Sequence, residues 1–231
     1  MANQSVMNQD RHSSRQPDDV PLRVWIGVAA SMLGAFMAVL DIQITNSSLQ
    51  DIQAALSATL EEGSWISTAY LVAEIVVIPL TGWLSQVFSI RRYILVNASL
   101  FIFFSICCAS AWDLSSMITF RALQGASGGI LIPMAFTNLL ISLPPAKQPV
   151  GLALFGITAT FAPSIGPTLG GWLTENLSWH YIFYLNVIPG LLLLAGVWYG
   201  IKQQPPKPEL LKQGDWWGIL RSEERRVGKE C

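Results

Sequence analysis

Six separated apolar stretches, each about twenty residues long, dominate this chain and limit what it can fold into. The core of a lipid bilayer is about 30 Å thick, and roughly 20 helical residues cross it. Helices are favoured there because they satisfy their own backbone hydrogen bonds. Hydrophobic residues make up 52% of the chain and charged residues 13%, so the helices lack the charged faces that a large soluble protein presents to water. The sequence therefore predicts an all-α, polytopic transmembrane helix bundle whose spans cover residues 24–45, 65–84, 93–111, 115–140, 150–173 and 181–201.

The segments that connect these spans alternate in charge. The loops after the first, third and fifth spans contain acidic residues but no Lys or Arg. By the positive-inside rule, this pattern predicts that the N-terminus and the segment after the sixth span are cytoplasmic. Outside the spans and before residue 221, the basic residues all lie on that side: Arg11, Arg15, Arg23, Arg91, Arg92, Lys147, Lys202, Lys207 and Lys212.

The chain divides into four predicted parts. Residues 1–23 form a polar cytoplasmic tail without a cleavable signal peptide, residues 24–201 form the bundle, and residues 202–220 form a cytoplasmic linker and the start of a seventh span. Residues 221–231 resemble the translation of a sequencing-library adapter, so we interpret them as an artefact and expect the chain to be a fragment. The three cysteines lack the spacing of a disulfide framework or a metal site, and no cofactor or nucleic-acid partner is expected.

Charged side chains inside the predicted spans mark the first candidate functional positions, because each costs at least about 2.5–3.5 kcal/mol at mid-bilayer on insertion scales. Asp41 lies in the outer half of the first span and Arg121 in the outer part of the fourth, so the two can pair across the bundle. Glu74 lies near the middle of the second span. Two interpretations stay open. The charges form a structural ion pair with a protonated, hydrogen-bonded Glu74, or the carboxyl groups exchange protons in response to burial and to the nearby Arg, as proton coupling requires.

The fourth predicted span carries polar and small residues on one helical face, because Arg121, Gln124, Gly125 and Gly128 recur at helical spacing. Small residues let two helices approach closely. Glycine spacing alone indicates packing, but an intramembrane Arg on the same face favours a functional role.

The fifth predicted span carries two prolines, which remove backbone donors and kink a helix. Such a helix suits a part that rocks against its neighbours, and a static kink explains the residues equally well. The residues concerned are Pro163, Gly166, Pro167, Gly170 and Gly171. Between the second and third spans, a short cytoplasmic loop is predicted to join two antiparallel helices through Gly82, Gln86, Arg91 and Arg92.

Together these motifs resemble the major facilitator superfamily, and within it the fourteen-span drug:proton antiporter branch that includes EmrB and QacA. The resemblance covers roughly residues 35–218. Asp41 is similar to the acidic first-span motif, Arg121 with its polar and glycine neighbours to the fourth-span motif implicated in proton coupling, and Gly166-Pro167 to the antiporter motif of the fifth span. In the loop between the second and third spans, the superfamily expects Asp, a basic residue and Gly where this chain has Gln86, Val87 and Ser89.

The resemblance implies the six-span N-terminal half of a major facilitator fold, and a transporter rather than an enzyme. The expected function is proton-coupled efflux of amphipathic or cationic drugs across the cell inner membrane by alternating access. The expected residues for proton coupling and the substrate pathway are Asp41, Glu74, Arg121 and Gln124, the role of Glu74 being an argument from physics alone. The expected partners are lipid, drugs, protons, a missing C-terminal bundle of the same chain, and the periplasmic membrane-fusion adaptor and outer-membrane channel that serve EmrB-like pumps.

Two other functions are weighed against this one. A membrane-embedded enzyme usually has clustered His, Asp or Glu residues near an interface, but the only histidines, His12 and His180, have no partner constellation. A non-transporting scaffold or sensor, or an inert fragment, is the alternative that stays open, although the intramembrane charges argue against it.

Overall fold

The computed structural model describes residues 20–203, and everything in this part of the chain that is regular is helical. The predicted tail up to residue 19, the predicted linker from residue 204, and the adapter-like residues 221–231 lie outside the described residues. The helices are α2 (Leu22–Ser47), α3 (Leu49–Ala55), α4 (Leu60–Phe88), α5 (Ile90–Ala109), α6 (Leu114–Gly128), α7 (Leu131–Ser142), α8 (Gln148–Asn176), α9 (His180–Tyr184) and α10 (Val187–Gly200).

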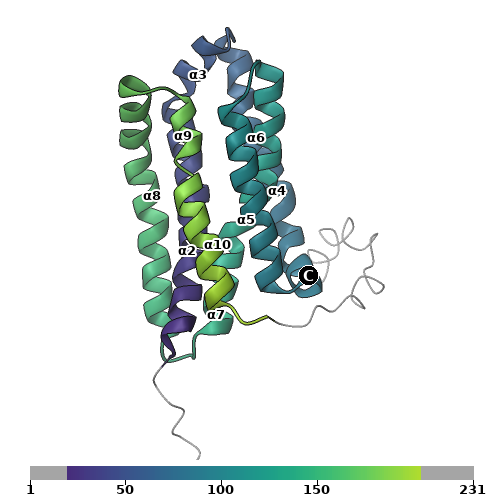
Figure 1. Cartoon of the computed structure of the whole chain (residues 1–231), viewed down its shortest axis with the longest axis vertical. Helices are drawn as coiled ribbons and strands as arrows, with labels where there is room; N and C mark the ends of the chain where they lie inside the picture. The colour runs from purple at the N-terminus through teal and green to yellow at the C-terminus, as the bar shows by residue number, and fades with distance from the viewer. Residues whose placement is uncertain (1–19, 204–231) are drawn as a thin grey trace, which may run out of the picture.

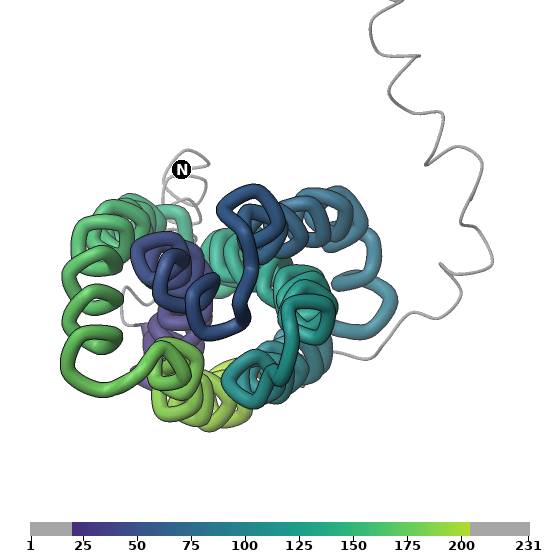
Figure 2. The backbone as a smooth tube through the Cα atoms, turned by 90° about the horizontal axis from the view of Figure 1, so that it is seen from above, coloured from purple at the N-terminus to yellow at the C-terminus, as the bar shows by residue number. Residues whose placement is uncertain are grey.

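These helices provide six segments long and apolar enough to cross a membrane, with α6–α7 and α9–α10 each counting as one. They run up and down in alternation, so that α3 lies at one end of the bundle and the start of α2 at the other (Figure 1). Seen along the bundle, α8 and α4 lie on opposite sides and α2 lies beside α8 (Figure 2). The all-α, six-span prediction is confirmed.

The ends of the helices differ from the predicted spans by a few residues. The largest difference is at α4, which begins at Leu60 instead of residue 65. The Thr59 hydroxyl accepts a hydrogen bond from the Glu62 backbone N–H, and the Glu62 carboxylate accepts one from the Thr59 backbone N–H. This capping box satisfies two donors at the helix start, so residues that hydropathy places in a loop are helical.

Two of the predicted spans are interrupted. The fourth breaks between Gly128 and Leu131, and the sixth breaks between Tyr184 and Val187. Each break is followed by a proline, Pro133 or Pro189, which has no N–H to donate to the carbonyl four residues earlier. By contrast, α8 runs unbroken through both of its prolines.

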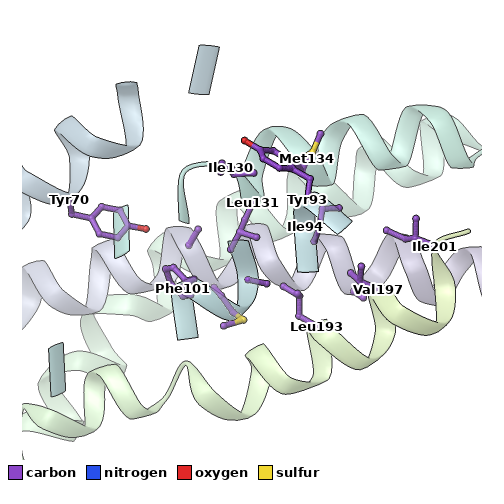
Figure 3. Close-up of a cluster of buried hydrophobic side chains, with 14 residues drawn as sticks. Tyr70, Tyr93, Ile94, Phe101, Ile130, Leu131, Met134, Leu193, Val197 and Ile201 are labelled. Carbon is purple, nitrogen blue, oxygen red and sulfur yellow. The ribbon is translucent and has the colours of Figure 1, made fainter. Parts of the chain in front are cut away.

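The interior is built by close approach of backbones as well as by apolar side chains. Gly27 of α2 meets Gly200 of α10 so tightly that a methyl group on Gly27 would lie 2.9 Å from the Gly200 carbonyl carbon. Small residues permit such contacts between membrane helices, where van der Waals packing drives association. A buried cluster that includes Phe101, Leu131 and Leu193 fills the space between α5, α7 and α10 (Figure 3).

The structure corrects the prediction of a cytoplasmic loop between the second and third spans. Gly82 and Gln86 lie inside α4, and Arg91 and Arg92 lie in the first turn of α5, so only Ser89 stands between the two helices. Ser89 has φ 73° and ψ 132°, a backbone conformation that favours glycine. The guanidinium of Arg91 lies over the Trp198 ring at 4.4 Å from its centroid, which ties the start of α5 to the end of α10.

Candidate functional site

The centre of the bundle contains a buried ion pair. Arg121 Nη1 on α6 donates a hydrogen bond of 2.5 Å to Asp41 Oδ2 on α2. Both side chains are fully enclosed, at 1% and 2% exposure. Removing one partner of such a pair leaves an uncompensated buried charge, which is strongly unfavourable. The predicted pairing of these two residues across the bundle is confirmed.

Two carboxamides complete the surroundings of Asp41. Oδ1 accepts hydrogen bonds from Asn186 Nδ2 at 2.6 Å and from Gln124 Nε2 at 3.1 Å. Gln124 Oε1 in turn accepts from Arg121 Nη1 at 2.9 Å. Donors therefore face both oxygens of Asp41, an arrangement that matches an ionised carboxylate, which can only accept.

Ser105 on α5 joins this cluster to the break in the sixth span. Its hydroxyl donates to the Phe183 carbonyl oxygen at 2.9 Å and accepts from Asn186 Nδ2 at 3.0 Å. Cys108, one turn along α5, lies against the Gln124 amide with its Sγ 3.5 Å from Oε1. The polar cluster is thus defined by Asp41, Ser105, Arg121, Gln124 and Asn186, which come from α2, α5, α6 and the start of α10.

Aromatic rings cover the guanidinium of Arg121. Its Cζ lies 4.3 Å from the ring centroid of Tyr70 on α4 and 5.7 Å from that of Phe183 on α9. Such cation–π contacts are worth about 2 kcal/mol when they are desolvated. Within residues 20–203, Arg121 Nε and the Tyr70 hydroxyl have no hydrogen-bond partner although both are buried. The Nε of Arg121 is therefore an unused donor enclosed in the bundle.

Glu74 lies apart from this cluster. It is 7% exposed and sits one turn beyond Tyr70 on α4, where its side chain packs against Gly129 at the break in the fourth span. In the described part of the chain, no hydrogen bond or ion pair joins its carboxyl group to another residue, and its oxygens are not among the fully enclosed unpaired atoms. The structure therefore gives Glu74 a buried carboxyl group without a hydrogen-bond partner in the described part of the chain, and no direct bond to Arg121.

The glycines of the fourth-span motif serve helix contact. The position of a Cβ on Gly125 is occupied by the Tyr70 carbonyl oxygen, and a Cβ on Gly128 would lie 2.6 Å from the Tyr70 hydroxyl. Gln124 and Arg121 lie on the same buried side of α6. The glycines bring α4 close enough for its Tyr70 ring to cover the guanidinium. The small residues of the motif thus help to enclose its polar residues.

The glycines of the fifth-span motif lie against α2, on the helix that carries Asp41. Gly166 packs on the Gln43 side chain, and a Cβ on Gly170 would lie 2.9 Å from the Ile44 carbonyl oxygen. Gly171 faces open space instead. Pro163 and Pro167 lie inside the continuous helix α8 and away from the polar cluster.

Sequence reasoning missed three members of the site. Ser105 and Asn186 are single polar residues within apolar spans, and Tyr70 belongs to an apolar face. The available signal was the amide of Asn186 next to a proline-containing helix start, because a buried Asn requires partners. The predicted residues Gly82, Gln86, Arg91 and Arg92 do not join the site, since they lie at the end of the bundle where α4 meets α5. No group of His, Cys, Asp and Glu suited to a metal ion occurs among residues 20–203.

The helix arrangement and the charged interior can be compared with known proteins. The profile of the Major Facilitator Superfamily matches residues 31–226. The chain belongs to this superfamily. Its members are transporters rather than enzymes, and the chain is a multi-pass membrane protein of that family.

Relatives by sequence include two proteins of drug resistance. The chain is 42% identical over 196 residues to the colistin resistance protein EmrB of Acinetobacter baumannii, which covers 85% of this chain and 38% of that protein. It is 40% identical over 169 residues to the multidrug export protein EmrB of Haemophilus influenzae, which covers 73% of this chain and 33% of that protein. The chain thus spans about a third of the length of these relatives.

Solved structures agree on the fold. The proton:xylose symporter XylE bound to 6-bromo-6-deoxy-D-glucose superposes with a TM-score of 0.69 at 16% identity, over 88% of this chain and 50% of that one. A peptide transporter solved in complex with sulfate gives a TM-score of 0.67 at 15% identity, over 87% of this chain and 44% of that one. At these identities the likeness supports the fold alone.

Proposed function

We propose that this chain is the N-terminal bundle of a proton-coupled efflux transporter for amphipathic or cationic drugs. The observation that carries the proposal is the buried Asp41–Arg121 pair, held by donors on both carboxylate oxygens. Charged groups in a membrane interior are rare and are retained mainly where ions or substrates move. The names of the relatives, which refer to multidrug export and colistin resistance, supply the substrate class.

The mechanism follows from what one proton does to this pair. Protonation of Asp41 removes the negative charge that Arg121 neutralises and adds a proton donor where only donors are present. Arg121 must then find another acceptor, and its unpaired Nε offers a donor for one. Glu74 provides a second protonation position, because its buried carboxyl group has no hydrogen-bond or ion-pair partner among residues 20–203. A change of charge in the interior biases the bundle between two orientations, as alternating access requires.

The location and partners of the transporter are part of the same proposal. In the described part of the chain, the basic residues outside the helix interiors lie at the ends of helices on the side where α2 begins: Arg23, Arg91, Arg92, Lys147 and Lys202. This supports a cytoplasmic N-terminus in the cell inner membrane. A periplasmic adaptor and an outer-membrane channel are proposed by similarity to EmrB, and co-purification of the chain's full-length transporter tests them.

The test of transport uses the full-length transporter that carries this bundle, in everted membrane vesicles with an imposed pH gradient. Addition of a lipophilic cation should release protons in the native protein, and Asp41→Asn should abolish that release at normal expression. Asp113→Asn is the matched control, because Asp113 is an exposed helix cap on α6 outside the membrane. Full drug-driven proton release in both Asp41→Asn and Glu74→Gln would end the proposal.

A further inference from the structure

The break in the sixth span is fastened to the Asp41 carboxylate by one amide. Asn186 stands between α9 and α10 and is 3% exposed. It occupies the N-cap position of α10 but makes no capping hydrogen bond with its side chain. Its Nδ2 instead donates hydrogen bonds to Asp41 Oδ1 at 2.6 Å and to Ser105 Oγ at 3.0 Å.

The orientation of this amide is fixed by its neighbours. The Ser105 hydroxyl donates its proton to the Phe183 carbonyl oxygen at 2.9 Å, so towards Asn186 it can only accept. Asp41 Oδ1, when ionised, can also only accept. The amide therefore presents Nδ2 to both groups, and its oxygen points away from them.

We infer that Asn186 is the positioning residue through which protonation of Asp41 acts on the sixth span. The inference rests on the proposed function, since it takes Asp41 as the group that binds the proton. When a proton binds Asp41 Oδ1, the new O–H group, which is a donor, faces the Asn186 Nδ2 group, which is also a donor. The amide must turn to offer its oxygen, and Nδ2 then leaves both Asp41 and Ser105. The α9–α10 break then loses its amide attachment to Asp41 on α2 and keeps only the hydrogen bond from the Ser105 hydroxyl to the Phe183 carbonyl oxygen on the α5 side. The sixth span thus contains a part that responds to one proton.

Other groups that titrate or carry charge near Asp41 are few. Arg121 faces it from α6, Tyr70 and Glu74 approach from α4, and Cys108 lies in the cluster from α5. Within residues 20–203, α8, α9 and α10 bring no titratable side chain into hydrogen-bond contact with it. Arg121 stays charged at all relevant pH values. Substitutions must therefore show which of the two carboxyl groups, Asp41 or Glu74, gives rise to a pH-dependent change.

Cys108 supplies a built-in reporter. The thiol is fully buried and lies against the Gln124 amide, inside the polar cluster. The experiment uses the 231-residue chain in lipid nanodiscs, with Cys107→Ser and Cys231→Ser to leave one thiol. Reaction with 4,4′-dithiodipyridine, which proceeds in acid, is measured from pH 8 to pH 4 and divided by the rate in denaturant at each pH. We expect protection at neutral pH and a rise in reactivity as Asp41 is protonated.

Loss of the amide should move this transition. A hydrogen bond to a charged group favours the charged form, so Asn186→Leu should let Asp41 bind its proton more readily and raise the midpoint by about one pH unit or more. Ser105→Ala should move it in the same direction, and it replaces Asn186→Leu if that variant does not fold. Asn138→Leu is the matched control. Asn138 is an equally buried amide that donates to Ser31 Oγ at 2.9 Å and has no bond to Asp41. The midpoint of the Cys108 transition should therefore be the same in Asn138→Leu as in the native protein.

The outcomes separate the inference from the proposed function. Asp41→Asn should abolish the transition and Glu74→Gln should keep it. A midpoint that stays in both Asn186→Leu and Ser105→Ala overturns the role of Asn186, and so does a transition that survives Asp41→Asn. Neither result bears on drug-driven proton release, which is measured separately and on which the proposed function depends.

Discussion

Ser89 is one of two residues between 20 and 203 that have a positive φ without being glycine. Its φ of 73° and ψ of 132° lie in a region that residues with a side chain rarely adopt. Its hydroxyl is buried without a hydrogen-bond partner within residues 20–203. Both features follow from a turn of one residue between α4 and α5, at the position where the superfamily expects Gly.

Replacing this residue should stabilise the protein. We expect Ser89→Gly to raise the free energy of unfolding by about 1 kcal/mol, because relief of strain and of an unpaired hydroxyl exceeds the entropy that glycine loses on folding. Ser48→Gly separates the two causes. Ser48 also has a buried, unpaired hydroxyl, but its φ is −101°. Unfolding in mixed micelles with rising SDS measures both variants, and a Ser89→Gly protein no more stable than the native one contradicts the strain argument.

The polar cluster was only partly predictable from single residues. The pairing of Asp41 with Arg121 could be derived because a position along a span fixes depth in the membrane, and two charges at one depth favour pairing. Depth does not fix the direction in which a side chain points. The roles of Ser105 and Asn186 therefore depend on helix packing, which hydropathy does not contain. The influence of Arg121 on Glu74 was inferred from charge alone, and the two groups do interact electrostatically in the structure. Glu74 nevertheless packs against Gly129 and makes no direct hydrogen bond to Arg121.

Among the elements, glycines determine how closely two pairs of helices meet. Gly125 of α6 lies on the backbone of α4 at Tyr70, and Gly170 of α8 lies on the backbone of α2 at Ile44. Both contacts hold a helix that carries part of the polar cluster or covers it. Their spacing was visible in the sequence. The helix breaks in the fourth and sixth spans were not predicted, since Pro133 and Pro189 stand within uninterrupted apolar stretches.

A single methyl group should distinguish glycines in contact from glycines that are not. Gly125→Ala and Gly170→Ala should each lower the free energy of unfolding by about 1–3 kcal/mol, because the added carbon collides with backbone that cannot turn away. Gly171→Ala and Gly82→Ala meet nothing within 4 Å. In these two, alanine should raise the stability by up to about 1 kcal/mol through its better helix propensity. The same SDS titration measures all four, and equal effects of Gly170→Ala and its neighbour Gly171→Ala would refute the packing argument.

At the scale of the whole molecule, the bundle encloses its polar centre and exposes large apolar side chains on its outer helices. Asp41 and Arg121 are sealed by the helices around them. The exposed faces of α4 and α8 carry large apolar side chains, among them Ile75, Val76, Ile157 and Phe161. The two helices lie on opposite sides of the bundle (Figure 2), and lipid or another apolar surface must cover their exposed side chains.

These features predict what the 231-residue chain does by itself. Alternating access needs two bodies that rock around a site between them, and this chain forms one bundle whose charges face inward. We therefore expect no efflux when the chain alone is reconstituted in proteoliposomes with an imposed pH gradient and a fluorescent lipophilic cation. A full-length relative in the same vesicles is the positive control, and protection of the buried Cys108 thiol at neutral pH, compared with denaturant, confirms that the chain is folded there. Proton-driven efflux by the chain at a rate near that of the relative would mean that copies of this bundle supply both bodies, and Asp41→Asn should then abolish that efflux because each copy carries its own proton site.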